Sequence, residues 1–378
     1  MSAAPTIPNT PEARRAGAIL TIDLDALQSN WRALAAQAPN VETAAVVKAQ
    51  AYGLAVGKAA PALHAAGCKT FFVASIDEAI ELRHILGKGP TIHVFNGFMD
   101  GAEREFIEFD LIPVLNSLGD MDAWQAFCAG YGHAVPCDIH VDTGMSRLGL
   151  PPYEVQKIAD NPDHLMHLKV ETVLSHLVAA EEADHPKSPE QLAAFKAAMA
   201  HFPGARASLA NSSGIFLGAD YHFDLTRPGT SLYGVNPTPD QANPMAQVVR
   251  LQGKILQVRA IDTPQSVGYG ATYTAQGAER IATISVGYAD GYLRSLSNAG
   301  VAYVGDHPAP VVGRVSMDLI GLDVSAVPED LCHPGMLVDL IGPHNPVDDV
   351  ADRAGTIGYE ILTSLGARYH RVYVGGEI

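Results

Sequence analysis

Short apolar segments rich in β-branched residues alternate with longer amphipathic segments from about residue 40 onward. The rhythm predicts eight strands, at 42–49, 70–75, 91–96, 111–115, 136–142, 168–176, 206–210 and 224–228. Ser75 and Ser188 each start a capping-box pattern, which marks two helix starts between strands. Strict alternation of strand and helix implies a parallel sheet, and eight units close a (β/α)8 barrel of the TIM type. A doubly wound sheet is the alternative, but the chain has neither GxGxxG nor GxxxxGK[ST].

The pattern of apolar and turn-forming residues changes after a Pro/Asn-rich connection near residue 240. Short apolar runs separated by Gly, Asp-Gly and Pro then predict a mostly antiparallel β-domain, with strands at 248–261, 280–288, 301–304, 310–315 and 336–341 and one helix near 355–366. We therefore expect three parts: a flexible tail over 1–16, the barrel over 17–243 and the β-domain over 244–378.

The charge balance excludes some classes of partner. The chain has 25 Lys+Arg against 41 Asp+Glu, a net charge of −16, so we expect neither nucleic acid nor an anionic membrane surface as the main partner. No apolar run approaches the ~18 residues of a spanning helix, and the start lacks the apolar core of a signal peptide. The four cysteines form no CxxC pair, which favours free thiols in a reducing compartment. We expect a cytoplasmic protein without a metal site.

Reactive groups in a (β/α)8 barrel lie at the C-terminal ends of the strands. The residues that the predicted strands place there are Lys48, Asn96, Arg147, His176, Asn211, Ser212, Arg227 and Gly229. Burial and nearby cations lower the pKa of a lysine in the mouth of a barrel, so that it can form a Schiff base, and the loops after strands seven and eight commonly hold a phosphate. Together with two arginines, this set suggests pyridoxal phosphate and a substrate that bears a carboxylate.

Each of these residues also has an ordinary structural interpretation. A lysine at a strand end usually extends to water, and Ser212 or Ser213 could simply cap a helix. Residues 210–214 also resemble a nucleophile elbow, in which Ser212 would act with a downstream histidine such as His307 or His333, but no oxyanion-loop motif accompanies them. The densest group of possible metal ligands, His164, His167, Glu181, Glu182, Asp184 and His185, lies mostly in what the sequence predicts to be a solvated loop.

Eight motifs in this order resemble the alanine racemase family, over a span from about residue 18 to residue 375. They are AVVKAQAYG (45–53), VDTGMSRLG (141–149), SHL (175–177), ANSSG (210–214), RPGTSLYG (227–234), VGYADGY (286–292), GRVSMD (313–318) and TIGYE (356–360). The resemblance implies a (β/α)8 barrel followed by a β-domain, acting as a homodimer with shared active sites and pyridoxal 5'-phosphate. The implied activity is the interconversion of L- and D-alanine, which supplies D-alanine for cell-wall peptidoglycan.

The resemblance also implies roles for individual residues. Lys48 would hold the cofactor as a Schiff base and act as the base on one face of the substrate, and Tyr288 of the partner subunit would act on the other face. The expected cofactor contacts are Tyr52, Asn211, Ser212, Gly229 and Tyr359, with Arg227 at the pyridine nitrogen and His176 beside the ring. Arg147 and the backbone of Met317 would bind the substrate carboxylate.

The sequence departs from the family at several positions. His140 stands where many members carry a lysine that becomes carbamylated and braces the substrate arginine. Gln50, Leu54-Ala55 and Ser208 also replace more usual residues, which could alter the pocket and the substrate range. Three alternatives stay open: a racemase that also accepts serine or other small amino acids, a related decarboxylase of the same architecture, and a non-catalytic pyridoxal phosphate carrier. Arg227 and the Tyr288 motif argue against a decarboxylase, and the extra β-domain argues against a carrier.

Overall fold

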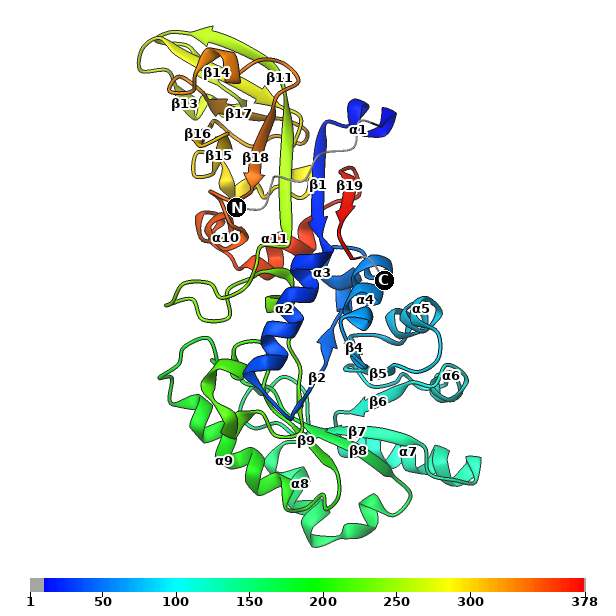
Figure 1. The fold of residues 1–378 in the computed structure, drawn as a ribbon. Coiled ribbons are helices and arrows are strands. Elements are labelled where there is room, and N and C mark those ends of the chain that lie inside the picture. The colour runs from blue at the N-terminus through cyan, green and yellow to red at the C-terminus, as the bar shows by residue number, and fades with distance from the viewer. Residues whose placement is uncertain (1–9, 377–378) are drawn as a thin grey trace.

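The first of two stacked units is a barrel of short parallel strands wrapped by helices (Figure 1). The computed structural model describes residues 10–376. The barrel strands are β2 (Glu42–Thr43), β3 (Ala45–Val46), β4 (Thr70–Val73), β5 (Thr91–Val94), β6 (Ile112–Leu115), β7 (Pro136–His140), β8 (Lys169–Leu174), β9 (Arg206–Ser208) and β10 (Leu225–Thr226). The surrounding helices are α2 (Leu24–Gln37), α4 (Val56–Ala65), α5 (Ile76–Leu86), α6 (Glu103–Glu108), α7 (Leu118–Tyr131), α8 (Pro152–Asp160) and α9 (Lys187–Met199). The (β/α)8 prediction is confirmed, with β2 and β3 together forming its first strand.

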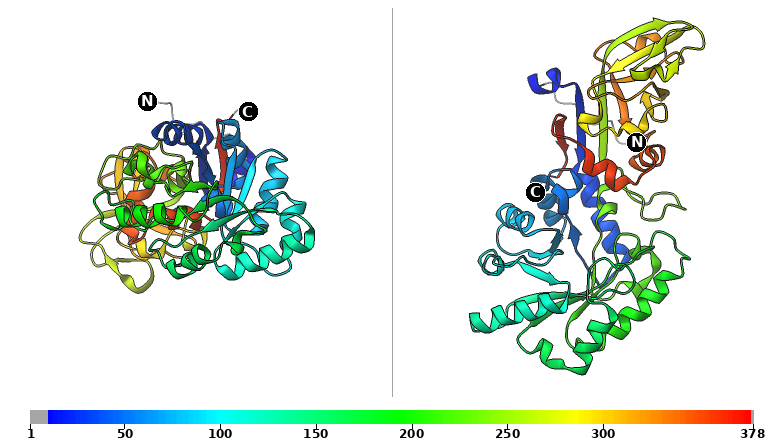
Figure 2. Two further views of the ribbon diagram at one scale, coloured as in Figure 1. Left: turned by 90° about the horizontal axis from the view of Figure 1, so that it is seen from below. Right: turned by 180° about the vertical axis from the view of Figure 1, so that it is seen from behind.

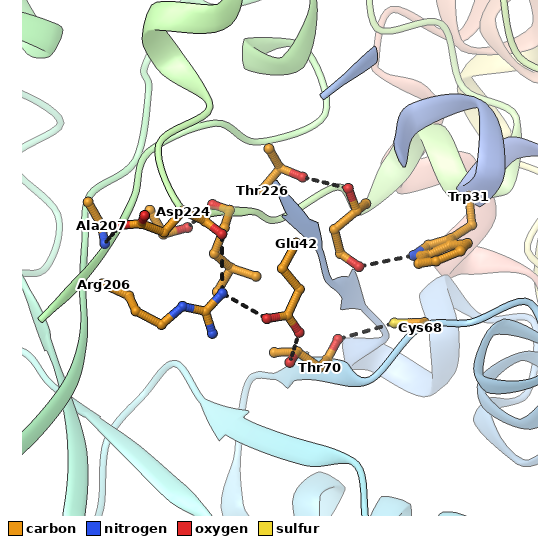
Figure 3. Close-up of polar contacts among 11 residues, drawn as sticks. Trp31, Glu42, Cys68, Thr70, Arg206, Ala207, Asp224 and Thr226 are labelled. Carbon is orange, nitrogen blue, oxygen red and sulfur yellow. Dashed lines mark hydrogen bonds and ion pairs between the residues drawn. The ribbon is translucent and has the colours of Figure 1, made fainter. Parts of the chain in front are cut away.

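The barrel closes where its first strand meets its last. Strands β3 to β9 form a seven-stranded parallel sheet, and β10 pairs in parallel with β2. Backbone N–H groups of Asp224 and Arg227 donate to the β9 segment, which completes the ring. Side chains reinforce this seam (Figure 3): the Glu42 carboxylate accepts hydrogen bonds from Thr70 at 2.5 Å and from Arg206 at 2.7 Å, and so joins β2 to β4 and β9.

The second unit is a β-domain that stands on the barrel and gives the molecule an elongated shape (Figure 2). Its main strands are β1 (Ala18–Asp23), β11 (Val249–Ile261), β14 (Glu279–Ile284), β15 (Val301–Val304), β16 (His307–Val312), β17 (Ile320–Asp323), β18 (Leu337–Ile341) and β19 (His370–Val374). They lie in the order β14-β17-β16-β15-β18-β11-β1-β19, and a further β14–β11 pairing closes six of them into a barrel. A small hairpin, β12 (Ser266–Val267) and β13 (Tyr273–Thr274), and two helices, α10 (Val347–Ala354) and α11 (Gly358–Ser364), complete the unit.

The start of the chain differs from the sequence prediction. β1, predicted within the barrel segment 17–243, pairs antiparallel with β11 and parallel with β19, so it belongs to the β-domain sheet. The physical reason is that its apolar residues are buried between two strands that come from the far end of the chain, a pairing that local sequence cannot reveal. Residues 1–9 of the predicted tail lie outside the described residues. The remainder of that tail contains a short helix, α1 (Pro11–Arg15), and Lys254 Nζ donates to the carbonyl oxygens of Ala13 and Arg14.

Helix starts follow the capping rules in one of the two predicted cases. Ser75 and Glu78 form the expected capping box at α5. The capping box expected at Ser188 is wrong, because α9 begins two residues earlier, with Pro186 at its cap, and the Ser188 hydroxyl is buried without a partner. Among the described residues, no helix is long and apolar enough to cross a lipid bilayer.

The junction of the two units depends on one buried amide. Asn30, 2 % exposed, donates to the carbonyl oxygens of Leu232 and Ala246 and accepts from the Ala246 N–H. We expect Asn30→Leu to lower the free energy of unfolding by about 3 kcal/mol, because three backbone groups lose their partner. Urea denaturation measures this loss. Gln156→Leu is the matched control, since its exposed amide bonds only Asp160, and an equal loss in both variants would contradict the prediction.

Candidate active site

Lys48 follows strand β3 after one residue, Val47, at the mouth of the barrel. The next turn, labelled α3 (Lys48–Tyr52), is left-handed: Ala49, Gln50, Ala51 and Tyr52 have φ between 51° and 56°. For residues with a β-carbon this conformation costs roughly 1–2 kcal/mol each. Gly53 ends the turn with φ 84°, where a β-carbon would overlap the Leu362 carbonyl oxygen of α11. The backbone is therefore strained in the turn that presents Lys48, as the backbone at functional sites often is.

Glu78 holds this turn against helix α5. One carboxylate oxygen accepts from the Ala49 N–H at 2.7 Å, and the other accepts from the Ala74 N–H at 2.8 Å. Next to it, Gln50 donates to Glu81 at 2.6 Å. Burial and, less strongly, Arg147 lower the pKa of Lys48, while the Glu78 charge opposes this shift. Glu78 thus holds the backbone of the lysine turn and partly offsets the lowering of the Lys48 pKa.

The cavity above Lys48 has two adjoining parts of about 230 Å³ and 310 Å³. Both parts are lined by Lys48, Phe95, Arg147, His176 and Arg227. The smaller part also contains Tyr52, Asn211, Ser212, Gly229, Thr230 and Tyr359, and the larger part also contains Asn96 and His140. The structure therefore brings nine predicted residues to one cavity: Lys48, Tyr52, Arg147, His176, Asn211, Ser212, Arg227, Gly229 and Tyr359.

The smaller part of the cavity is rich in hydroxyl groups. Ser212 Oγ accepts from the N–H groups of Gly229 at 3.0 Å and Ser231 at 3.3 Å, which leaves its own hydrogen available to a ligand. Thr230 Oγ1 is buried without a hydrogen-bond partner. A β-carbon at position 229 would overlap the Tyr52 hydroxyl, so glycine is required for the tyrosine to reach the cavity. Hydroxyl donors around a closed recess fit a phosphate group.

Arg227 is a buried side chain that lines both parts of the cavity. The side chain is 3 % exposed and donates to Ser208 Oγ and to the Ser175 carbonyl oxygen. Burial lowers its pKa to about 10, and the buried Asp138 partly offsets that shift, so the guanidinium stays charged at neutral pH. Burial and then Arg227 lower the pKa of His176 to about 3, which keeps that imidazole neutral. A fixed guanidinium beside a neutral imidazole favours an electron-rich or anionic ligand.

Tyr288 and Met317 lie elsewhere. They are neighbours in the β-domain, where the Tyr288 and Ala289 N–H groups donate to the Ser316 and Met317 carbonyl oxygens. Their side chains are 42 % and 53 % exposed, and neither residue lines the cavity. Tyr288 occupies a turn, η6 (Tyr288–Asp290), held by the bidentate ion pair of Asp290 with Arg368. Within one chain, the predicted second base is therefore separate from the predicted first.

The alternative nucleophile at Ser212 lacks its partner histidine. His307 lies in β16 of the β-domain and His333 in an exposed turn beyond β17, and neither lines the cavity. The possible metal ligands named above lie on both sides of β8, and the described residues contain no group of three or more side chains that could hold a metal ion. Sequence reasoning missed Glu78, whose only signal was its place in a capping box, and it missed Asn116, which carried no signal. The amide nitrogen of Asn116 donates to the carbonyl oxygens of Phe95 and Val114, so its Oδ1 faces Nδ1 of the cavity residue His140 at 2.8 Å and selects the tautomer that is protonated there.

Comparison with known proteins finds matches for both units of the chain. Residues 22–237 match the model of the alanine racemase N-terminal domain, and residues 248–373 match that of the C-terminal domain. A curated alanine racemase of Rhodospirillum rubrum is 55 % identical over 362 residues, which are 96 % of this chain and 97 % of that protein. A catabolic alanine racemase of Mesorhizobium japonicum is 49 % identical over 376 residues, 99 % of this chain and 98 % of the relative.

The solved structures agree. Alanine racemase from Bartonella henselae, crystallised with covalently bound pyridoxal phosphate, superposes with a TM-score of 0.92 at 45 % identity, covering 95 % of this chain and 100 % of that one. The biosynthetic enzyme from Pseudomonas aeruginosa superposes with a TM-score of 0.89 at 32 % identity, with the same coverage. The resemblance first seen in eight short motifs thus extends over both units, and the chain belongs to the alanine racemase family.

Proposed function

We propose that this chain interconverts L- and D-alanine, with pyridoxal phosphate linked covalently to Lys48. The observation that carries the proposal is one cavity at the C-terminal ends of the barrel strands, lined by a lysine of lowered pKa, a buried arginine and a cluster of hydroxyl groups. The unpartnered Thr230 hydroxyl and the glycine at 229 fit the phosphate of that cofactor. Tyr52, Asn211, Ser212 and Tyr359 surround the same recess.

Each residue of the cavity has a task in this reaction. Pyridoxal phosphate, when bound, supplies an electron sink for the electron pair left when the α-proton departs. Lys48 Nζ takes or returns that proton on one face, and its lowered pKa increases the fraction of free amine at neutral pH. Arg227 would face the pyridine nitrogen of the bound cofactor and, being unable to release its proton there, would leave that nitrogen unprotonated. Arg147 binds the substrate carboxylate, and neutral His176 lies beside the ring.

The second base comes from another copy of the chain. Tyr288 and the backbone of Met317 lie on a face of the β-domain where Tyr269 and Leu319 are also exposed, at 73 % and 41 %. Large exposed apolar side chains of this kind mark an interface. A homodimer would bring the Tyr288 hydroxyl of one subunit over the substrate face opposite Lys48 of the other. The D-alanine formed would supply cell-wall peptidoglycan, in a cytoplasm that keeps the four buried cysteines reduced.

Exchange of the α-proton tests the activity directly. Incubated with L-alanine or D-alanine in D2O, the holoenzyme should lose the α-proton signal and form the other enantiomer. Tyr288→Phe should keep the absorbance of the Lys48-linked cofactor, yet in a single turnover exchange should fall about a hundredfold or more from one enantiomer and far less from the other. Equal, unimpaired exchange from both enantiomers would contradict the assignment of two bases. L-Serine in the same assay measures substrate range.

Subunit mixing tests the shared site. Lys48→Ala and Tyr288→Phe should each be nearly inactive alone. After unfolding and refolding together in equal amounts, half of the dimers are mixed, and each mixed dimer has one site with both residues intact, so about a quarter of the wild-type activity should return. If both bases belonged to the same subunit, no activity would return. Refolded wild-type enzyme is the control for recovery.

Glu78 is expected to support cofactor binding through the lysine turn. Glu78→Gln replaces an acceptor oxygen with an NH2 group, so the Ala49 or the Ala74 N–H loses its partner and the Lys48 pKa falls further. We expect the dissociation constant for pyridoxal phosphate to rise about tenfold, because a hydrogen bond to a charged acceptor is lost. Glu81→Gln is the matched control, because its carboxylate bonds only the Gln50 side chain. An equal rise of the dissociation constant in both variants would show that Glu78 does not support cofactor binding through the lysine turn.

A further inference from the structure

Two turns of the β-domain meet where Tyr288 and Met317 are presented. The Tyr288 and Ala289 N–H groups donate to the carbonyl oxygens of Ser316 and Met317, each at 3.0 Å. Gly287 lies in the contact between the turns, because a β-carbon there would overlap the Met317 carbonyl oxygen. The two turns are therefore packed backbone against backbone, with no side chain between them.

One guanidinium also joins the two turns through their carboxylates. Arg368 donates from Nε to Asp290 Oδ1 at 2.6 Å and from one terminal nitrogen to Asp290 Oδ2 at 2.8 Å. Its other terminal nitrogen donates to Asp318 Oδ1 at 2.7 Å. Asp290 is the last residue of η6, the turn that begins at Tyr288, and Asp318 directly follows Met317. All three nitrogens of the guanidinium thus bind the turns that carry the proposed second base and its neighbour.

Asp290 is the centre of this arrangement. Its side chain is 8 % exposed, and Oδ2 accepts from the Gly287 N–H at 2.9 Å in addition to the guanidinium. Its carbonyl oxygen accepts from the Gly366 N–H at 2.9 Å, in the segment between α11 and β19 that also carries Arg368. The turn η6 is therefore held on one side by residues 316–318 and on the other by residues 366–368.

The groups that would meet the substrate are left free by these contacts. Within residues 10–376, neither the Tyr288 hydroxyl nor the Met317 N–H has a hydrogen-bond partner. The Tyr288 side chain is 42 % exposed, so its own packing does little to orient the ring. Its position depends on the backbone of the turn, and that backbone is held by Asp290.

We propose that Arg368 is a positioning residue for the second base: by binding Asp290 and Asp318 together it holds the Tyr288 hydroxyl and the Met317 N–H in one arrangement. The inference rests on the proposed function, because it needs Tyr288 to transfer a proton. Proton transfer requires the base within hydrogen-bond reach, and a misplacement of about 1 Å can cost about a hundredfold in rate. A planar guanidinium fixes two carboxylates in direction as well as in distance, which an ammonium group does not.

Replacement of Arg368 by lysine tests the role of the fork without removing its charge. Arg368→Lys still balances the charge of Asp290, and the arginine side chain is 52 % exposed, so we expect the variant to fold. In D2O, single-turnover exchange of the α-proton should fall about tenfold from one enantiomer of alanine, the same one that Tyr288→Phe slows. Exchange from the other enantiomer should fall less than about twofold. Added to Tyr288→Phe, Arg368→Lys should cost less than about a further twofold, because the base is already absent.

Arg250→Lys is the matched control. Arg250 forms a bidentate ion pair with Asp339, at 2.8 Å and 2.9 Å, which joins β11 to β18 in the same domain, and the carboxylate there is also 8 % exposed. Loss of this fork should leave the ratio of the two exchange rates unchanged. Exchange is compared at a protein concentration where sedimentation shows every variant to be a dimer, because loss of the partner would itself remove Tyr288. Thermal unfolding and the absorbance of the Lys48-linked cofactor check the fold and the cofactor.

The ratio of the two exchange rates decides the outcome. The positioning role is overturned if Arg368→Lys slows exchange equally from both enantiomers or from neither. It is overturned as well if Arg250→Lys produces the same asymmetry, or if the effect of Arg368→Lys persists in full beside Tyr288→Phe. If Tyr288→Phe itself leaves both exchange rates unchanged, the two-base assignment is wrong, and Arg368 then has no base to position.

Discussion

The site depends on a single strained turn. From Ala49 to Tyr52 four consecutive residues with β-carbons are left-handed, at a cost of about 4–8 kcal/mol in total. That turn places Lys48 at the barrel mouth and directs Tyr52 against Gly229. Three features oppose the strain: the Glu78 carboxylate on Ala49, the backbone bond from Ala51 to Val47, and Gly53 packed against α11, where Arg371 donates to its carbonyl oxygen. The geometry of the lysine is therefore set by α5 and α11 as much as by its own strand.

Charge in the cavity is arranged around a surplus of cations. Lys48, Arg147 and Arg227 are the formal positive charges on its walls, and the two histidines beside them, His140 and His176, are held neutral. The buried Asp138 partly compensates Arg227, but it is itself bound to His93 and the Thr172 N–H. A phosphate and a carboxylate, both anions, would complete the balance. A surplus of positive charge of this kind attracts anionic ligands.

The β-domain contributes in two different ways. Its last helix, α11, lies against the barrel of its own chain and places Tyr359 in the smaller part of the cavity. Its turn η6 carries Tyr288 away from that cavity. Pairing of β1 between β11 and β19 joins the two ends of the chain in one sheet of the domain that carries Tyr288.

Local sequence determined much of this protein. The alternation of strands and helices determined the barrel, because burial on both faces demands continuous apolar runs, and strand ends determined which polar residues reach its mouth. Family motifs added Tyr52, Tyr359, Tyr288 and Met317. Three features were decided by the tertiary structure alone. They are the placement of β1, the hydrogen bonds of Glu78 to the lysine turn, and the Asn116 amide that selects the tautomer of His140. These depend on pairs such as 18 with 253, 49 with 78 and 116 with 140, and contacts so far apart in the chain leave no periodic signal that local sequence could reveal.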